Sequence, residues 1–247
     1  MKQYYDFKIE KIKDLSPEEI HLRKKNLELF YQIGFPNKND EDWKFSDLNS
    51  ILSKNFNNIA NNNFLPKEKN FKIIEEFEHN YISLFDGKIV SKDFSYEEKN
   101  KVLIDNFNYK DEPIFDNKNS LFILNNALST GGFSLEISKN YKLKKPLIIY
   151  NNFSTLLKET IVNYKNLIIL NENSELNLIN YINNSSRENF MVNTVENIKM
   201  KKNSSLNNIL INNSKCNGYF YKYIKCDLEK NSSLENYLIS SGLKFNK

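Results

Sequence analysis

The chain has 247 residues, 40% of them hydrophobic, which is enough for one large domain or two small ones with a sizeable core. Its net charge is +4, and only Arg23 and Arg187 are arginines. This disfavours nucleic-acid binding, because proteins that grip phosphates and base edges favour the arginine fork. The two cysteines do not suggest a disulfide framework, the N-terminus has no apolar signal segment, and no run approaches the roughly 20 apolar residues of a membrane span. We therefore expect a cytoplasmic protein without nucleic-acid or membrane partners.

The first predicted element is a helix that begins after Ser16 and ends at Gly34. Ser16 is a favourable N-cap, Pro17 suits the first helical turn, and Glu19 stands at the capping-box position. Gly34 is a typical helix terminator, and Pro36 follows it.

A second short helix is predicted from Asp47 to Phe56, followed by a loop in the Asn- and Lys-rich residues 57–70. Residues 81–90 then predict a β-hairpin, because two β-prone runs flank Asp86-Gly87, and Asp-Gly is a strong hairpin signal.

Residues 95–107 and 117–128 alternate apolar and polar residues with a helical period, so helices are expected there. From residue 133 onward the pattern changes to short strands separated by Asn, Ser and Lys turns. The domain boundary is therefore placed near residue 130, with an α-rich cap over residues 1–130 that includes the hairpin, and a β-helix core over residues 131–247. The predicted strands are Phe133–Ile137, Leu147–Tyr150, Ile161–Leu170, Leu176–Ile182, Met191–Met200, Leu206–Ile211, Tyr219–Leu228 and Leu234–Ile239.

An Asn-centred turn returns four times in the second half of the chain, at Asn140, Asn173, Asn203 and Asn231. The intervals are 33, 30 and 28 residues, and each turn lies between short apolar runs. Repeats of this period are typical of solenoids, in which each unit buries its apolar face on its neighbours. Asn tolerates positive φ better than most residues and can turn a corner without glycine. The predicted fold is α+β, with helices followed by a β-solenoid whose equivalent corner leucines stack inward: Leu143, Leu176, Leu206 and Leu234.

One segment after the first helix is distinctive and contains the only tryptophan. It reads Gly34-Phe35-Pro36, then Glu41, Trp43, Lys44, Phe45 and Ser46. This segment resembles the N-terminal signature of SufD-type proteins of the SUF iron–sulfur cluster assembly system. Residues 121–149 are similar to the family's entry into its β-helix, and residues 166–173 are similar to its repeated coil.

The resemblance implies a right-handed parallel β-helix and a place in a complex that builds iron–sulfur clusters for delivery to apoproteins. It implies a SufB-like homologue and a SufC-like ATPase as partners, with the cluster handled by the complex and no cofactor bound by this chain alone. Family members continue through more coils and a helical region that carries the cluster-associated Cys and His residues. We therefore expect the chain to be truncated, ending inside the solenoid at Lys247, and a separate chain carrying the remaining half is a further candidate partner.

The distinctive segment is interpreted as a structural motif made of Gly34, Pro36, Trp43, Lys44 and Phe45. A large aromatic residue just after a helix usually belongs to a core, so Trp43 is expected to pack the N-terminal helices against the solenoid.

No catalytic or metal-binding residue is predicted. Cys216 and Cys226 are ten residues apart, which is neither a zinc nor a CxxC spacing, and each is expected to be a buried, inert thiol in a strand. His21 and His79 are expected on the surface, without the nucleophile that a general base requires. The chain has no phosphate-binding glycine loop, so we expect no ATP hydrolysis by the chain itself.

The first functional hypothesis is a non-catalytic, SufD-like scaffold subunit of an iron–sulfur cluster assembly complex. The alternatives are a carbohydrate-active β-helix enzyme and an inactive fragment of a SufD-like gene. An enzyme of that kind needs carboxylates gathered on one strand face. The carboxylates of this half are mostly expected at or near corners: Glu136, Glu159, Glu172, Glu175, Glu196, Asp227, Glu229 and Glu235.

Overall fold

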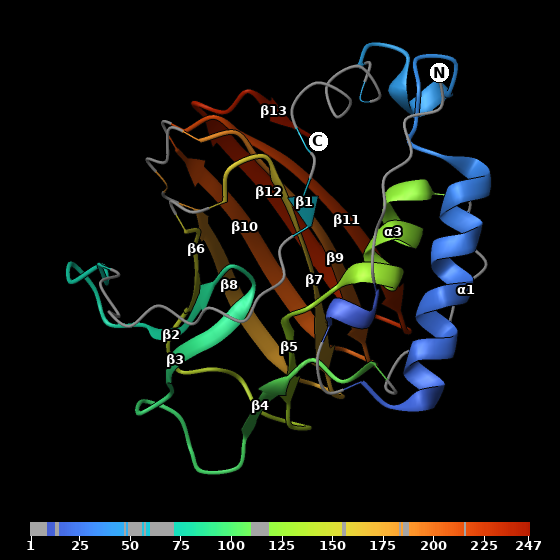
Figure 1. Cartoon of the computed structure of the whole chain (residues 1–247). Helices are drawn as coiled ribbons and strands as arrows, with labels where there is room; N and C mark the ends of the chain where they lie inside the picture. The colour runs from blue at the N-terminus through green and yellow to red at the C-terminus, as the bar shows by residue number, and fades with distance from the viewer. Residues whose placement is uncertain are drawn as a thin grey trace.

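The computed structural model describes residues 9–12, 15–46, 48, 56, 58–59, 72–109, 119–154, 157–182, 184, 188–214 and 216–247. Two β-sheets enclose a common apolar core, and the helices lie along one of them (Figure 1). The helices are α1 (Pro17–Ile33) and α3 (Ser120–Leu128), with short 3-10 turns η1 (Ile9–Lys11) and η2 (Glu41–Trp43).

Sheet A and sheet B divide the strands between them. Sheet A contains β1 (Asn58–Ile59), β4 (Val102–Asn106), β5 (Gly132–Ile137), β7 (Thr160–Leu170), β9 (Phe190–Met200), β11 (Gly218–Leu228) and β13 (Phe245–Asn246). Sheet B contains β2 (Asn80–Phe85), β3 (Lys88–Asp93), β6 (Leu147–Asn152), β8 (Glu175–Ile182), β10 (Ser205–Asn213) and β12 (Ser233–Ser241).

From β5 onward, successive strands alternate between the two sheets. Sheet A adds β7, β9, β11 and β13 in order, sheet B adds β8, β10 and β12 after β6, and every one of these pairings is parallel. Each coil therefore contributes one strand to each sheet. This confirms the predicted parallel β-solenoid and all eight strands predicted after residue 132.

The coils turn at the four predicted asparagines. Asn140, Asn173, Asn203 and Asn231 have φ values of 58°, 58°, 58° and 59°. From the second corner onward, the side-chain Nδ2 donates to the side-chain Oδ1 of the Asn one coil earlier. The N–O distances are 2.7 Å for Asn173, 3.0 Å for Asn203 and 3.2 Å for Asn231. The four residues form a continuous amide ladder along one edge of the solenoid, the corner ladder.

The leucines after the corners stack inward as predicted. Leu176, Leu206 and Leu234 are register partners. Leu176 and Leu206 are each 1% exposed, while Leu143 and Leu234 are partly buried against the same core.

The first helix begins and ends where the sequence predicts. The Ser16 hydroxyl accepts a hydrogen bond from the Glu19 backbone N–H at 3.2 Å, and Gly34, at φ 78°, donates its N–H to Phe30 O. The predicted helix at residues 117–128 is confirmed as α3, with Asn119 as its N-cap. Neither described helix has the length and apolar character needed to cross a membrane.

Helix α3 lies between α1 and sheet A, which explains why all of its residues are buried. Polar contacts tie it to both neighbouring elements. Asn125 Nδ2 donates to Tyr164 O at 3.0 Å and to Asn193 O at 2.7 Å. The Arg23 guanidinium of α1 donates to Ala127 O and Ser129 O at the end of α3.

Several predictions before residue 130 need correction or lie outside the described residues. The helix expected at residues 95–107 is wrong, because residues 102–106 form β4, which pairs antiparallel with β5. The predicted hairpin is confirmed as β2 and β3, with Asp86 and Gly87 both at positive φ. Of the loop expected at residues 57–70, Asn58–Ile59 form β1 beside β7. The second helix expected at residues 47–56 lies outside the described residues except for Leu48 and Phe56, which are buried.

Candidate functional site: a polar layer inside the solenoid

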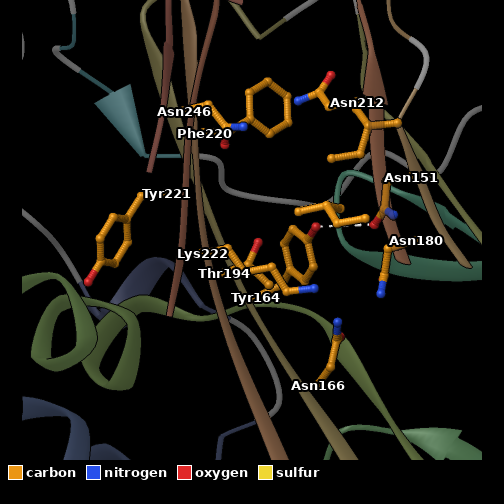
Figure 2. A pocket seen from close by; sticks show the side chains of 12 residues that line it. Asn151, Tyr164, Asn166, Asn180, Thr194, Asn212, Phe220, Tyr221, Lys222 and Asn246 are labelled. Carbon is orange, nitrogen blue, oxygen red and sulfur yellow. Dashed lines mark hydrogen bonds between the residues drawn. The ribbon is translucent and has the colours of Figure 1, made fainter. Parts of the chain in front are cut away.

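A layer of polar side chains crosses the otherwise apolar interior of the solenoid. Side chains alternate between the two faces of a strand, and the inward positions of β7 run Val162, Tyr164, Asn166 and Ile168. The layer continues into the next coils through register pairing, which aligns Tyr164 with Thr194 and Lys222, and Asn166 with Glu196. Asn151 and Asn180 face it from sheet B (Figure 2).

The centre of this layer is a buried ion pair. Glu196 has no exposed surface, and its Oε1 lies 2.9 Å from Lys222 Nζ, whose side chain is 15% exposed. Neither carboxylate oxygen has a hydrogen-bond donor in good geometry among the described residues, so the pairing is mainly Coulombic. A buried charge is strongly unfavourable without an opposite charge. Each of the two residues is therefore required by the other.

Tyr164 is a neutral donor in the same layer. Burial, and to a smaller extent the negative charge of Glu196, raises the pKa of the Tyr164 phenol well above its usual range, although a hydrogen bond with Thr194 acts in the opposite direction. The phenol donates to Asn151 Oδ1 at 3.2 Å and so links the two sheets across the interior (Figure 2).

A small cavity lies among these side chains. Its volume is about 20 Å³, which is enough for an ordered water but not for an organic substrate. Asn166 Oδ1 and Asn212 Oδ1 are buried, line the cavity and have no described hydrogen-bond partner, so a water would satisfy them. The arrangement supports a hydrated polar interior rather than a reaction chamber.

The distinctive N-terminal segment reaches the opposite, outer side of sheet A. Trp43 is 5% exposed, with its ring centroid 5.6 Å from that of Tyr221 and 6.1 Å from that of Phe245. Lys247 Nζ lies 4.4 Å from the centre of the Trp43 ring. Trp43 therefore joins the N-terminal region to β11 and β13.

The other members of this segment have separate environments. Pro36 is buried, Gly34 ends α1, Lys44 is exposed and Phe45 is 95% exposed. Within the motif, Trp43 makes the ring contacts with β11 and β13.

Two family models match the chain. The SufBD protein N-terminal region matches residues 1–149 and the SUF system FeS cluster assembly, SufBD core domain matches residues 153–247. The chain belongs to the SufB/SufD family. The comparison with curated proteins found no match. The two matches confirm the coarser part of the resemblance, which is membership of the SufB/SufD family, and they support a role in SUF iron–sulfur cluster assembly.

The two thiols of this SufB/SufD-family chain lie near the end of the solenoid. Cys216 is 5% exposed in the turn between β10 and β11, not in a strand, and Cys226 is half-buried on β11. Burial raises the pKa of both thiols, and the negative charge of Glu196 raises that of Cys226 further. Both cysteines are therefore neutral at pH 7, whereas nucleophiles and metal ligands are thiolates.

The histidines and carboxylates differ in part from expectation. His21 is exposed as predicted, but His79 is 7% exposed, because its Nε2 bonds the Tyr150 hydroxyl at 2.8 Å and its Nδ1 bonds Phe77 O. Glu196 lies in the middle of β9 rather than at a corner. In the part of the chain that the structure describes, no three His, Cys, Asp or Glu side chains gather in a way that could hold a metal ion.

Sequence reasoning missed the polar layer, although a signal was present. When β7, β9 and β11 are aligned in register, Tyr164, Glu196 and Lys222 occupy positions whose side chains point into the solenoid, where an apolar residue is expected. The sequence pattern alone does not reveal that Glu196 and Lys222 come from neighbouring coils and neutralise each other.

Proposed function

We propose that this SufB/SufD-family chain is a SufD-type scaffold subunit of a cytoplasmic SUF complex. In this role it pairs with a SufB-like homologue and positions a SufC-like ATPase, while the iron–sulfur cluster is carried by the complex. The chain itself catalyses no reaction and binds no cofactor alone. Family membership over residues 1–149 and 153–247 supports the place in the SUF system.

The observation that favours a scaffold over a sulfur- or cluster-handling subunit is the state of the two thiols. Cys216 and Cys226 are shielded by the solenoid, and burial raises the pKa of each. Sulfur transfer and cluster ligation both need thiolates, so neither residue is poised for that chemistry. The rest of the solenoid supports the same role, because the corner ladder and the buried Glu196–Lys222 pair both fix the relative position of neighbouring coils.

Co-expression with a SufB-like and a SufC-like protein tests the proposal. The wild-type chain is expected to co-purify with both, and the complex is expected to assemble a cluster when supplied with iron, a sulfur donor and reductant. The Cys216→Ser/Cys226→Ser variant should retain both properties.

Two outcomes would overturn the scaffold role. Loss of cluster assembly in the double Cys→Ser complex, with the complex itself intact, would make this chain a sulfur- or cluster-handling subunit. Failure of the wild-type chain to co-purify with either protein would remove it from a SufD-type position.

A further inference from the structure

The outer face of sheet B carries two unbroken rows of large apolar side chains. Register pairing aligns Ile148, Ile179, Ile209 and Tyr237 in one row, and Tyr150, Tyr181, Ile211 and Ile239 in the next. The side chains of these residues point away from the interior of the solenoid. The residues that alternate with them along the strands, such as Leu178 and Leu206, belong to the interior core.

The chain covers only the first part of these rows. Ile148 is 0% and Tyr150 is 2% exposed, and the segment at residues 74–79 contacts the Tyr150 side chain. Ile74 N donates to the Tyr150 hydroxyl at 3.0 Å, and His79 bonds the same hydroxyl. Among the described residues, this segment and Tyr81 of β2 therefore cover Tyr150 at the β6 end of the rows.

Beyond β6 the same rows are progressively exposed. The side chains on β8 and β10 are half-buried, while Tyr237 and Ile239 on β12 are 52% and 59% exposed. Both described helices lie on the side of sheet A (Figure 1). We call the six uncovered residues the sheet B patch: Ile179, Tyr181, Ile209, Ile211, Tyr237 and Ile239. Contiguous apolar surface with a polar rim is typical of protein-binding sites.

The border of the sheet B patch is polar and acidic. The adjoining row of side chains contains Asn177, Asn207 and Glu235, and the Glu235 carboxylate accepts a hydrogen bond from the Tyr237 hydroxyl at 3.0 Å. On the other side, the covering segment carries the exposed residues Glu75 and Glu76, and the negative charge of Glu76 acts on Tyr150. These exposed carboxylates favour a partner with basic side chains around its apolar surface.

We propose that the sheet B patch is a docking site for a basic amphipathic helix of another protein. Sheet A gives the precedent, since α3 covers the outer side of β7 and β9 in this same molecule. Three strands about 4.8 Å apart span roughly 10–15 Å, which matches two to three turns of helix. Apolar residues on one face of the helix fill the two rows, and flanking lysines or arginines meet Glu76 and Glu235. This inference is independent of the SufD-type assignment.

Peptide binding to the full chain tests the proposal. The probe is a fluorescent 14-residue Leu/Lys helix with one apolar face, compared with a Leu/Glu helix of the same pattern and with a Leu/Lys peptide of scrambled order. The Leu/Lys helix is expected to bind with 1:1 stoichiometry, at least tenfold more tightly than either control peptide, and more weakly as salt is raised.

Two variants of the sheet B patch and its border, with one control variant on sheet A, locate the site. Tyr237→Ser/Ile239→Ser should weaken binding at least tenfold, whereas Leu103→Ser, which removes a 48% exposed apolar residue from β4 of sheet A, should leave it unchanged. Glu235→Lys should weaken binding of the Leu/Lys helix several-fold and strengthen that of the Leu/Glu helix, and it leaves the apolar rows intact.

Three results would overturn the proposal. They are equal binding of the Leu/Lys and Leu/Glu helices, equal loss of binding in the Leu103→Ser control, and a dimer in sedimentation that Tyr237→Ser/Ile239→Ser dissociates. The last result would make a second copy the occupant.

Discussion

The contacts between the helices and sheet A are each made once, whereas the corner contacts repeat from coil to coil. Arg23, Asn125 and Trp43 each bind a different set of partners on or near sheet A. At the corners, one residue type in one backbone conformation makes the same amide contact in each coil. When a side chain between the helices and sheet A is removed, no other residue makes the same contact. A change at one corner, in contrast, leaves the other rungs of the ladder in place.

The largest expected effect tests the first half of this comparison. Trp43→Ala should lower the free energy of unfolding by roughly 3–5 kcal/mol, because a buried aromatic ring is replaced by a cavity between the N-terminal region and β11. Phe45→Ala is the matched control, since Phe45 is two residues away but 95% exposed, and its stability should be unchanged. Urea unfolding of both variants measures the difference. Equal stability of Trp43→Ala and wild type, with loss of partner binding, would make Trp43 an interface residue.

The next effect concerns Asp86, in the hairpin turn beside the first coil. Burial raises the pKa of its carboxyl to about 6, against the lowering effects of the Ser154 N–H and Lys88. A carboxyl whose pKa is higher in the folded state destabilises the fold as pH rises from its unfolded value through about 6. Asp86→Asn keeps an acceptor for Ser154 and a residue that tolerates positive φ.

Asp86→Asn is therefore expected to stabilise the protein by about 1–3 kcal/mol at pH 7.5, and the gain should disappear below about pH 4. Thermal unfolding of both proteins across this pH range checks the prediction. A variant that is less stable than wild type at pH 7.5 would show that the Asp86 charge is favourable, through Lys88 or another neighbour. The described ring contacts of Trp43 involve no Asp or Glu side chain, so the Trp43→Ala loss should not follow this profile.

The smallest effect tests the repeated contacts. Asn203→Ala should lower the free energy of unfolding by about 1 kcal/mol, chiefly because Ala, unlike Asn, is unfavourable at φ 58°. Asn203→Gly accepts this φ and loses only the two exposed amide contacts to Asn173 and Asn231, so it should cost less than Asn203→Ala. Denaturant unfolding of the two variants separates backbone strain from the ladder. A larger loss in the Gly variant than in the Ala variant would mean that the ladder itself carries the stability.

The repeated half of the molecule could be predicted from the sequence because the same pattern of turn and apolar residues recurs in each coil. The interval between corner asparagines and the period-2 apolar runs set both the turns and the strands of β5 to β12. The residues before 130 lack this redundancy. The segment at 95–107 has an apolar spacing compatible with a helix, but pairing with β5 makes residues 102–106 a strand. Tertiary pairing of this kind is not visible in local periodicity.

The candidate site was predictable only in its outline. Trp43 could be assigned to a core because a single large aromatic residue after a helix is rarely exposed, but its partners Tyr221 and Phe245 are about 180–200 positions further along the chain. The burial of His79 depends on Tyr150, and that of Glu196 depends on Lys222. From the sequence alone such polar residues are interpreted as exposed, because their partners lie far away along the chain.

The corner ladder also constrains where the chain can vary in length. At Asn173, Asn203 and Asn231 the strands are connected by residues 171–174, 201–204 and 229–232, which have the same length, whereas the first connection, 138–146 at Asn140, is longer. The connections on the opposite edge, 183–189, 214–217 and 242–244, become shorter along the chain. After the first corner, the repeat interval of the coils therefore changes at the opposite edge, while the connections at the ladder keep a constant length. Epitope tags, spectroscopic labels or fused domains should accordingly be kept out of the connections at the ladder, because added residues there would displace its rungs.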